Sequence, residues 1–256
     1  MISVAINGFG RIGRAVTRLI LQDPAAQKLI SIKAINCGPI NPENIDLLLK
    51  YDSEMGILKQ EISQHETTLT IDKQQIPLFF ETDPLRLPWK SLTIDWVIEA
   101  SGQLKTKKKA SLHQQSGARN VIITAPSPDA DITLISGIND NSYDPDRDKI
   151  ISFGSCTTNC FAPIIKVLHE EFGIIEGLMT TIHANTNDQN LVDSTHKDPR
   201  RARSAATNII PTKTGASDVI IQIFPELKDK IKAVSLRVPV PCVSIVDFTF
   251  LTKKKM

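Results

Sequence analysis

Two side chains that can work together as nucleophile and base occur at the ends of predicted elements. Cys156, within Ser155-Cys156-Thr157-Thr158-Asn159-Cys160, follows a short apolar run and precedes an amphipathic segment. A helix N terminus stabilises the thiolate, which is the nucleophilic form of cysteine. His183 ends the strand-like run 177–182, and an imidazole in reach of the thiol would act as its general base. The residues alone leave a packed cysteine and a structural histidine as alternatives.

A glycine pattern near the N terminus predicts a dinucleotide site. Gly8, Gly10 and Gly13 form G-x-G-x-x-G between the strand-like run 2–7 and a helical pattern. The first glycine permits a tight turn, the second lets the backbone approach a pyrophosphate, and the third allows close helix packing. Helix N–H groups would then face the anion. The alternative is a glycine-rich turn that binds nothing.

The second predicted strand ends in an unusual residue for such a site. An acidic side chain normally holds the adenosine ribose there, whereas this chain has Cys37. A thiol cannot accept two ribose hydrogen bonds as a carboxylate does. We therefore predict NAD as the cofactor, with weaker discrimination against NADP. The simpler interpretation of Cys37 is a small, half-buried residue.

The elements that position these residues predict an α/β protein. Strand-like runs alternate with helical patterns, as in a doubly wound Rossmann-type domain over residues 1–154. The strands are expected at 2–7, 30–35, 96–100, 121–124 and 150–153, with crossover helices carrying Ile12, Val16, Leu19 and Ile20, and then Ile45, Leu48 and Leu49. A hairpin, 67–71 with 76–80, is expected to decorate this sheet.

An α+β domain with a mixed sheet is predicted over residues 155–256. One helix carries Phe161, Ile164, Ile165, Leu168 and Phe172 on a face, and Pro163 is expected to disturb its early turns. Strands follow at 177–183, 231–238 and 242–251. A basic stretch with Lys197, Arg200, Arg201 and Arg203 lies between the first two of these strands.

Composition limits the classes of function. The 256 residues allow two modest domains, and 41% hydrophobic with 23% charged residues is typical of a globular chain. A formal charge of +2 indicates no nucleic-acid or membrane partner. The four cysteines form no C-x-x-C pair, so no metal site is predicted. Without a run long enough to cross a bilayer, the expected location is the cytoplasm.

The series of motifs resembles the phosphorylating glyceraldehyde-3-phosphate dehydrogenase family. The matching segments occur in family order from Met1 to about Leu251, and they are 7–14, 48–53, 155–160, 180–183, 196–198 with 200–203, 209–212 with 214–216, and 237–239. The resemblance implies that Cys156 attacks the aldehyde, that His183 is the base, and that inorganic phosphate releases the acyl group from a thioester. It also implies a homotetramer in which the loop 185–203 helps line a neighbour's cofactor site.

The resemblance also implies the remaining site residues. The attacking phosphate would be held by Ser155, Thr157, Thr214 and Gly215, and the substrate's own phosphate by Thr186 and Arg237. Cofactor contacts would come from Gly8, Gly10, Arg11, Ile12, Gly13, Cys37, Thr82 and Thr124. Erythrose-4-phosphate dehydrogenase shares the cysteine and histidine motifs, and the pair Thr214-Gly215 favours glyceraldehyde 3-phosphate over it.

This sequence departs from the family pattern in several places. Cys37 replaces the ribose-binding acid, Thr82 stands where an arginine is usual, and Phe153-Gly154 replaces Asn-Ala. The family continues beyond the segment that ends at Leu251, so we expect a catalytic domain that is incomplete at its C-terminal end. A non-catalytic remnant that still binds dinucleotide is therefore an alternative to an active dehydrogenase.

Overall fold

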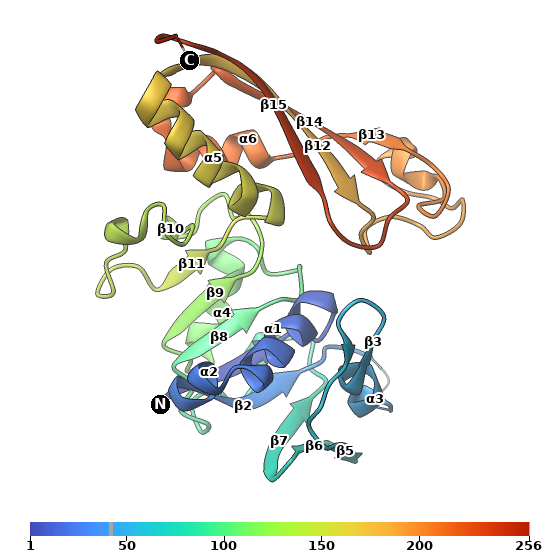
Figure 1. Cartoon of the computed structure of the whole chain (residues 1–256). Coiled ribbons are helices and arrows are strands. Elements are labelled where there is room, and N and C mark those ends of the chain that lie inside the picture. The colour runs from blue at the N-terminus through green and yellow to red at the C-terminus, as the bar shows by residue number, and fades with distance from the viewer. Residues whose placement is uncertain (41–42, 256) are drawn as a thin grey trace. The chain divides into compact units, whose positions relative to one another are not determined.

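The computed structural model describes residues 1–40 and 43–255, which form two compact units (Figure 1). The first unit contains Met1–Thr133 and Tyr143–Phe153. The second contains Leu134–Ser142 and the chain from Gly154 onward. The sequence-based division at 154 did not separate Leu134–Ser142, which joins the second unit because Ile135 and Ile138 pack into its hydrophobic core.

The first unit is built on a nine-stranded sheet with the order β10-β11-β9-β8-β1-β2-β7-β6-β5. Its strands are β1 (Ile2–Asn7), β2 (Ile30–Asn36), β5 (Ile62–His65), β6 (Thr68–Ile71), β7 (Gln74–Phe79), β8 (Trp96–Glu99), β9 (Asn120–Ile123), β10 (Ile132–Thr133) and β11 (Ile150–Ser152). The connections contain α1 (Arg11–Gln22), α2 (Pro24–Leu29), α3 (Ile45–Lys50), α4 (Lys107–Gln115), the turn η1 (Pro84–Arg86) and a small ribbon of β3 (Tyr51–Asp52) and β4 (Gly56–Ile57). The five parallel strands predicted from the sequence are present.

The centre of this sheet is the place where a ligand is expected. β1 pairs in parallel with β2 on one side and with β8 on the other, so the chain winds away from it in both directions. In a doubly wound sheet, ligands bind at the carboxyl ends of the strands where the order reverses. Asn7 closes β1 there, and its neighbours in register are Asn36 on β2 and Glu99 on β8.

The predicted hairpin forms, but it is part of the main sheet. β6 and β7 pair antiparallel, as the alternating pattern indicated. The other edge of β7 pairs in parallel with β2, through Ile35 with Leu78 and Asn36 with Phe79. The expectation that the hairpin only decorates the sheet was wrong. The alternating sequence pattern shows which side chains lie on each face of a strand, but it does not show which strands pair with its two hydrogen-bonding edges.

Helix α1 buries a different face from the one that its apolar pattern suggests. Ile12 and Leu19 are exposed, whereas Arg18 is fully buried. The Arg18 guanidinium donates to the carbonyl oxygens of Lys50, Met55 and Gly56 at 3.3, 3.2 and 2.7 Å. A buried arginine requires such partners, and here it ties α1 to the segment that follows α3.

The second unit contains a four-stranded mixed sheet with the order β13-β14-β12-β15. Its elements are η2 (Asp140–Ser142), α5 (Cys156–Phe172), β12 (Ile174–Ala184), η3 (Pro199–Ala202), β13 (Ile210–Thr212), α6 (Ala216–Ile223), η4 (Pro225–Leu227), β14 (Ile231–Val238) and β15 (Ile245–Thr252). β12 is parallel to β14 and antiparallel to β15. Helix α5 runs through Pro163 without interruption, in contrast to the expected disturbance.

One hydrophobic core joins the helices to this sheet. It contains Phe161 of α5, Ile220 of α6 and Met179 of β12, all fully buried. The ring of Phe248 on β15 meets Phe161 edge to face, with the centroids 4.9 Å apart. Gly177 makes this possible, because a Cβ there would lie 2.5 Å from the Phe248 ring.

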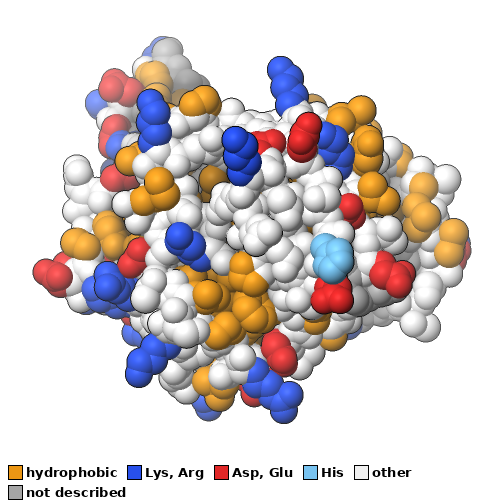
Figure 2. Space-filling view, turned by 90° about the horizontal axis from the view of Figure 1, so that it is seen from below, with side chains coloured by type: hydrophobic (Ala, Val, Ile, Leu, Met, Phe, Trp, Pro, Cys, Tyr) orange, Lys and Arg blue, Asp and Glu red, His pale blue; other side chains and the backbone are white. Residues whose placement is uncertain are grey.

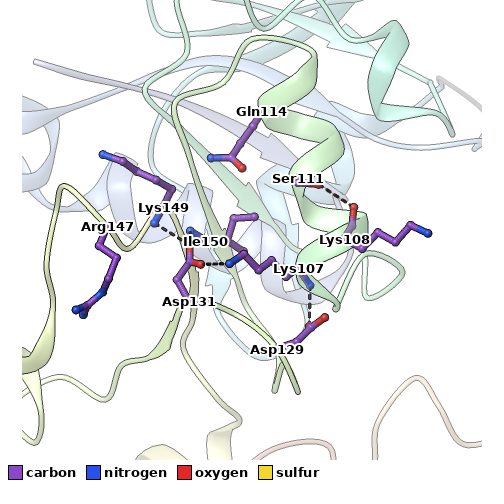
Figure 3. A pocket seen from close by; sticks show the side chains of 9 residues that line it. All are labelled: Lys107, Lys108, Ser111, Gln114, Asp129, Asp131, Arg147, Lys149 and Ile150. Carbon is purple, nitrogen blue, oxygen red and sulfur yellow. Dashed lines mark hydrogen bonds and ion pairs between the residues drawn. The ribbon is translucent and has the colours of Figure 1, made fainter.

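One face of the molecule carries mixed charge (Figure 2). On the face drawn in Figure 2, Lys and Arg side chains are interspersed with Asp and Glu around a hydrophobic cluster. A hollow of about 560 Å³ is lined by Lys107, Lys108, Ser111, Gln114, Asp129, Asp131, Arg147, Lys149 and Ile150 (Figure 3). Lys107 pairs with Asp131 at 2.5 Å and Arg147 with Asp148 at 2.9 Å. Two of the four cationic side chains that line this hollow are therefore paired with carboxylates.

Within the described residues, no helix combines the length and apolar character that a membrane span requires. The same described residues contain no group of three or more His, Cys, Asp or Glu side chains arranged to hold a metal ion.

Candidate active site

The reactive-cysteine candidate occupies the first position of α5. Gly154 precedes it in the left-handed region at φ 61°, a conformation that glycine adopts without strain. Ser155 is the N-cap, and its Oγ accepts a hydrogen bond from the Thr158 backbone N–H at 3.1 Å. Cys156 is exposed and lies where the partial positive charge of the helix terminus favours an anion. The predicted placement of the thiol at a helix N terminus is therefore present.

Cys156 and His183 are in direct contact although 27 positions separate them in sequence. The Sγ atom lies 3.2 Å from Nε2 of His183, which sits near the end of β12. This hydrogen bond lowers the pKa of the Cys156 thiol and raises the pKa of the His183 imidazole. Both shifts favour a thiolate–imidazolium pair, which is the arrangement of an activated nucleophile.

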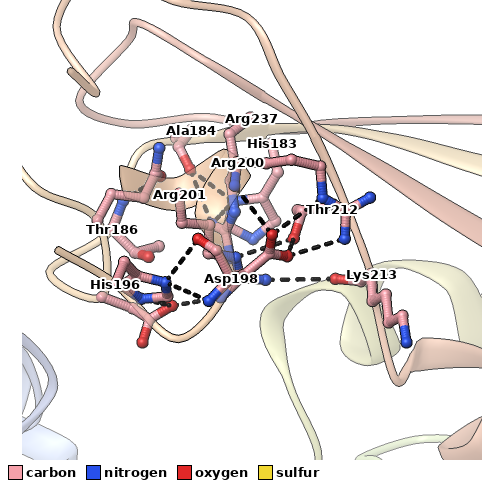
Figure 4. Close-up of polar contacts among 12 residues, drawn as sticks. His183, Ala184, Thr186, His196, Asp198, Arg200, Arg201, Thr212, Lys213 and Arg237 are labelled. Atoms are coloured by element: carbon pink, nitrogen blue, oxygen red, sulfur yellow. Dashed lines mark hydrogen bonds and ion pairs between the residues drawn. The ribbon is translucent and has the colours of Figure 1, made fainter. Parts of the chain in front are cut away.

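Arg237 completes this chain of contacts on the other side of the imidazole (Figure 4). The parallel register of β12 and β14 sets His183 beside Arg237. Nη1 of Arg237 lies 2.7 Å from His183 Nδ1 and donates to the Ala184 carbonyl at 3.0 Å. Nε of Arg237 is buried and has no hydrogen-bond partner among the described residues. A guanidinium so placed can bind an anion next to the thiol.

A second arginine near this site was not singled out from the sequence. Arg201 donates through Nε to Thr212 Oγ1 at 2.9 Å and forms an ion pair with Asp188. Thr212 in turn donates to Asp198 at 3.2 Å. Burial lowers the pKa of Arg237, and the charge of Arg201 lowers it further. The basic stretch was visible in the sequence, but no spacing distinguishes Arg201 from the arginines beside it.

Of the other predicted phosphate ligands, Thr157 contacts the chain Cys156–His183–Arg237, because its backbone N–H and its side chain both hydrogen-bond to the Cys156 thiol and lower the pKa of that thiol. Thr157 is buried in the first turn of α5. The Thr186 backbone N–H donates to Gln189 Oε1 at 3.2 Å. Thr214 Oγ1 accepts from the backbone N–H of Ala216 at 3.2 Å, and Gly215 is the N-cap of α6. Thr214 and Gly215 therefore lie at the N terminus of α6, where Gly215 has no side chain that could cap the helix.

The glycine turn in the first unit fits a pyrophosphate. A Cβ on Gly8 would lie 2.4 Å from the Ser101 backbone nitrogen, and one on Gly13 would lie 2.0 Å from the Gly8 oxygen. At Gly10 no atom lies within 4 Å of the Cβ position. No side chain caps the N terminus of α1, and its first turn holds no acidic residue. Backbone donors are thus presented at the place where the fold binds a dinucleotide phosphate.

The remaining predicted cofactor residues surround the same ends of the strands. Cys37 is 7% exposed, and burial raises the pKa of its thiol to about 12. Arg11 turns its guanidinium away to Asp52, with Nη1–Oδ2 at 2.6 Å. Ile12 and Thr82 are exposed. Thr124 donates through both its backbone N–H and Oγ1 to the Glu99 carbonyl, at 3.0 Å each.

Comparisons with known proteins agree with this arrangement of domains. Residues 2–107 match the family model of the glyceraldehyde 3-phosphate dehydrogenase NAD binding domain, and residues 155–256 match that of the C-terminal domain. The protein named glyceraldehyde-3-phosphate dehydrogenase 2 of Streptomyces avermitilis is 47% identical over 246 residues, which cover 96% of this chain and 72% of that protein. This chain belongs to the glyceraldehyde-3-phosphate dehydrogenase family.

Other relatives give the same result. The glyceraldehyde-3-phosphate dehydrogenase of Geobacillus stearothermophilus is 44% identical over 255 residues, covering 100% of this chain and 75% of the relative. Glyceraldehyde-3-phosphate dehydrogenase 2 of Bacillus subtilis is 47% identical over 246 residues, covering 96% and 71%. The predictions of the family, of a Rossmann-type domain followed by a mixed-sheet catalytic domain, and of NAD as cofactor are confirmed.

Proposed function

We propose that this chain oxidises glyceraldehyde 3-phosphate to 1,3-bisphosphoglycerate with inorganic phosphate, through a thioester on Cys156. The observation that carries the proposal is the contact of Cys156 Sγ with His183 Nε2 at 3.2 Å, with Arg237 on the far side of the imidazole. Relatives at 44–47% identity carry the name of this activity. These relatives give no support to erythrose 4-phosphate as the substrate or to a non-catalytic remnant.

The first half of the reaction uses the thiolate and the imidazolium. The Cys156 sulfur bonds to the aldehyde carbon, and His183 gives its Nε2 proton to the oxygen, which yields a hemithioacetal. His183 then takes this proton back while the C–H bond breaks and its electron pair leaves as hydride, so the carbon becomes a thioester. When NAD is bound, it supplies the acceptor for that hydride. The N–H groups at the start of α5 stabilise the oxyanion.

The second half transfers the acyl group to phosphate. A phosphate oxygen bonds to the thioester carbon and the C–S bond breaks, which releases the acyl phosphate and restores the Cys156 thiolate. His183 is already protonated at this stage and pairs again with the restored thiolate, so the one proton that the net reaction releases comes from the attacking hydrogen phosphate. Arg237 would hold the substrate's own phosphate with Thr186, and Ser155, Thr157, Thr214 and Gly215 would hold the attacking phosphate.

Phosphate-dependent NADH formation tests this function. The purified chain is mixed with glyceraldehyde 3-phosphate and NAD, with and without inorganic phosphate, and NADH absorbance is followed. We expect multiple turnovers only with phosphate and none with Cys156→Ser. A folded protein that binds NAD but forms no NADH would contradict the proposal. Erythrose 4-phosphate serves as the comparison substrate and should give a lower kcat/KM.

The assembly expected for the enzyme is a homotetramer in the cytoplasm, and an apolar sheet face supports self-association. Leu178, Val234, Ile245 and Leu251 are 49%, 46%, 63% and 58% exposed, and the strand register places them on the same face, opposite Met179. Exposed apolar patches mark interaction surfaces. Sedimentation equilibrium would measure the state, and Val234→Glu should shift it towards monomer.

A further inference from the structure

A carboxylate that the proposed chemistry does not use is buried beneath the dinucleotide turn. Glu99 closes β8 and is 2% exposed. A buried carboxylate is costly unless hydrogen-bond donors satisfy it. Glu99 has four such donor groups, one each from Asn7 and His113 and two from Ser101. So many hydrogen-bond donors around one buried carboxylate indicate that the position of Glu99 is tightly constrained.

Trp89 fixes the direction of one of these hydrogen bonds. Its indole N–H can only donate, and it lies 3.0 Å from Nδ1 of the fully buried His113. Nδ1 must therefore accept, which leaves the proton of the neutral imidazole on Nε2. Nε2 lies 3.0 Å from Glu99 Oε2 and donates to it. The indole thus sets the tautomer of His113, and His113 presents a fixed donor to Glu99.

The other donors come from the segments on which a dinucleotide would rest. Asn7 Nδ2 donates to Glu99 Oε2 at 2.5 Å, and Asn7 Oδ1 accepts from Asn36 Nδ2 at 2.7 Å. Ser101 donates to Glu99 Oε1 through its backbone N–H at 2.8 Å and through its hydroxyl. One row of hydrogen bonds therefore crosses the carboxyl ends of β8, β1 and β2.

This row lies next to the glycine turn. The Gly8 backbone follows Asn7 directly and lies so close to Ser101 that a Cβ would be 2.4 Å from its nitrogen. The Gly8 N–H donates to the Asn36 carbonyl at 2.8 Å. The carbonyl of Glu99 itself holds Thr124 through two hydrogen bonds of 3.0 Å. The Ser101 segment is thus bonded to the Glu99 carboxylate and Thr124 to the Glu99 carbonyl, and the Gly8 turn directly follows Asn7, which donates to the carboxylate.

We propose that Glu99 is a positioning residue for NAD: its carboxylate, oriented by His113 and Trp89, holds the Gly8 turn and the Ser101 segment in the arrangement that binds the dinucleotide. This inference rests on the proposed NAD-dependent function, but it concerns equilibrium binding and not turnover. The residue acts through the backbone segments around it and makes no chemical step itself.

The substitution Glu99→Gln tests the proposal because it keeps the shape and replaces one oxygen with an NH₂ group. Either orientation of the amide sets that NH₂ against donors, from Ser101 or from Asn7 and His113. We expect the Kd for NAD, measured by calorimetry, to rise about tenfold or more. The rate of Cys156 alkylation by iodoacetamide without cofactor should be unchanged, which reports that the second unit is folded.

Asp95→Asn is the matched control. The Asp95 carboxylate ties the chain just before β8 to β1 at the opposite ends of the strands, accepting from the Ser3 N–H at 2.9 Å and the Ser3 hydroxyl at 2.8 Å. This variant should lower Tm, as Glu99→Gln does, but leave the Kd for NAD within about twofold of the parent. An equal rise of Kd in both variants would mean general destabilisation and would overturn the proposal.

Trp89→Phe keeps the test decisive if Glu99→Gln fails to fold. It retains a buried aromatic ring and removes only the N–H that sets the His113 tautomer. We expect a smaller rise of the Kd for NAD in the same direction. If Trp89→Phe lowers Tm and leaves this Kd unchanged, the row of hydrogen bonds serves stability alone and the positioning role is refuted.

Discussion

Arg237 Nη1 lies 2.7 Å from Nδ1 of His183, on the side of the imidazole away from Cys156. The same Nδ1 is 2.7 Å from the Ala184 carbonyl oxygen. One ring nitrogen is thus next to both a donor and an acceptor, while the other faces the thiol. The pKa of His183 therefore depends on the position of the Arg237 guanidinium. An anion that draws Arg237 away from the imidazole would change this pKa.

Replacing Arg237 with Gln should alter both the base and substrate binding. The Cys156 hydrogen bond raises the pKa of His183, whereas burial and the Arg237 charge oppose that shift. Removal of the cation should therefore raise the pKa of His183 further, as measured by NMR titration of its imidazole. The KM for glyceraldehyde 3-phosphate should rise roughly tenfold or more with the loss of a charged phosphate contact.

Arg200→Gln is the control for that experiment. Arg200 pairs with Asp198 at 2.9 Å, and its side chain is 48% exposed. The pKa of His183 and the KM should both stay at the parent values. If the Arg237 and Arg200 variants behave alike, the proximity of Arg237 to His183 has no functional consequence.

Alkylation of Cys156 should depend on pH in a way that His183 determines. The hydrogen bond from His183 lowers the pKa of the thiol, so the thiolate forms at a lower pH than in an ordinary cysteine. In His183→Asn, the midpoint of the iodoacetamide rate should move up towards about 8.5, the reference for an unperturbed thiol. Cys156→Ser identifies the labelled site by mass spectrometry. An unchanged midpoint in His183→Asn would show that the helix terminus alone activates the thiol.

Local patterns in the sequence were sufficient for the five parallel strands of the first unit and for the placement of Cys156 and His183 at the ends of elements. The glycine turn, the parallel strands and the thiol at a helix N terminus each follow from neighbouring residues. The contact between Cys156 and His183 follows from the family resemblance. The spacing of the two residues alone does not determine that β12 brings His183 back to the start of α5.

The interactions that were missed join segments far apart in the sequence. His113 and Glu99 are 14 positions apart and Trp89 and His113 are 24 apart, with no periodic pattern linking them. The parallel pairing of β7 with β2 and the contact of Arg201 with Thr212 are of the same kind. Burial of these polar groups is decided by tertiary packing, which single-residue patterns do not encode.

The glycines of the turn should fail in different ways when replaced with alanine. At Gly13 a methyl group would lie 2.0 Å from the Gly8 oxygen and 3.3 Å from Ile6 Cγ2, so Gly13→Ala should reduce the free energy of unfolding by about 1–3 kcal/mol. At Gly10 nothing lies within 4 Å, so Gly10→Ala should unfold at the parent temperature but bind NAD more weakly. Thermal unfolding and calorimetry separate the two effects. A Gly10→Ala variant with unimpaired NAD binding would contradict the assigned position of the pyrophosphate.

Cys37 should weaken the discrimination between NAD and NADP. The thiol is buried, and its pKa is raised to about 12, so it is neutral and cannot repel a 2′-phosphate. In Cys37→Asp, a carboxylate would accept the ribose hydroxyls of NAD and repel NADP. We expect the ratio of kcat/KM for NAD to that for NADP to rise about tenfold. This rise corresponds to about 1.4 kcal/mol of added discrimination between the two cofactors, which a charge next to the 2′-phosphate can supply. Cys37→Ser, which adds no charge, should leave the ratio near the parent value. If Cys37→Asp leaves the ratio unchanged as well, selection against the 2′-phosphate depends on a residue other than the one that ends β2.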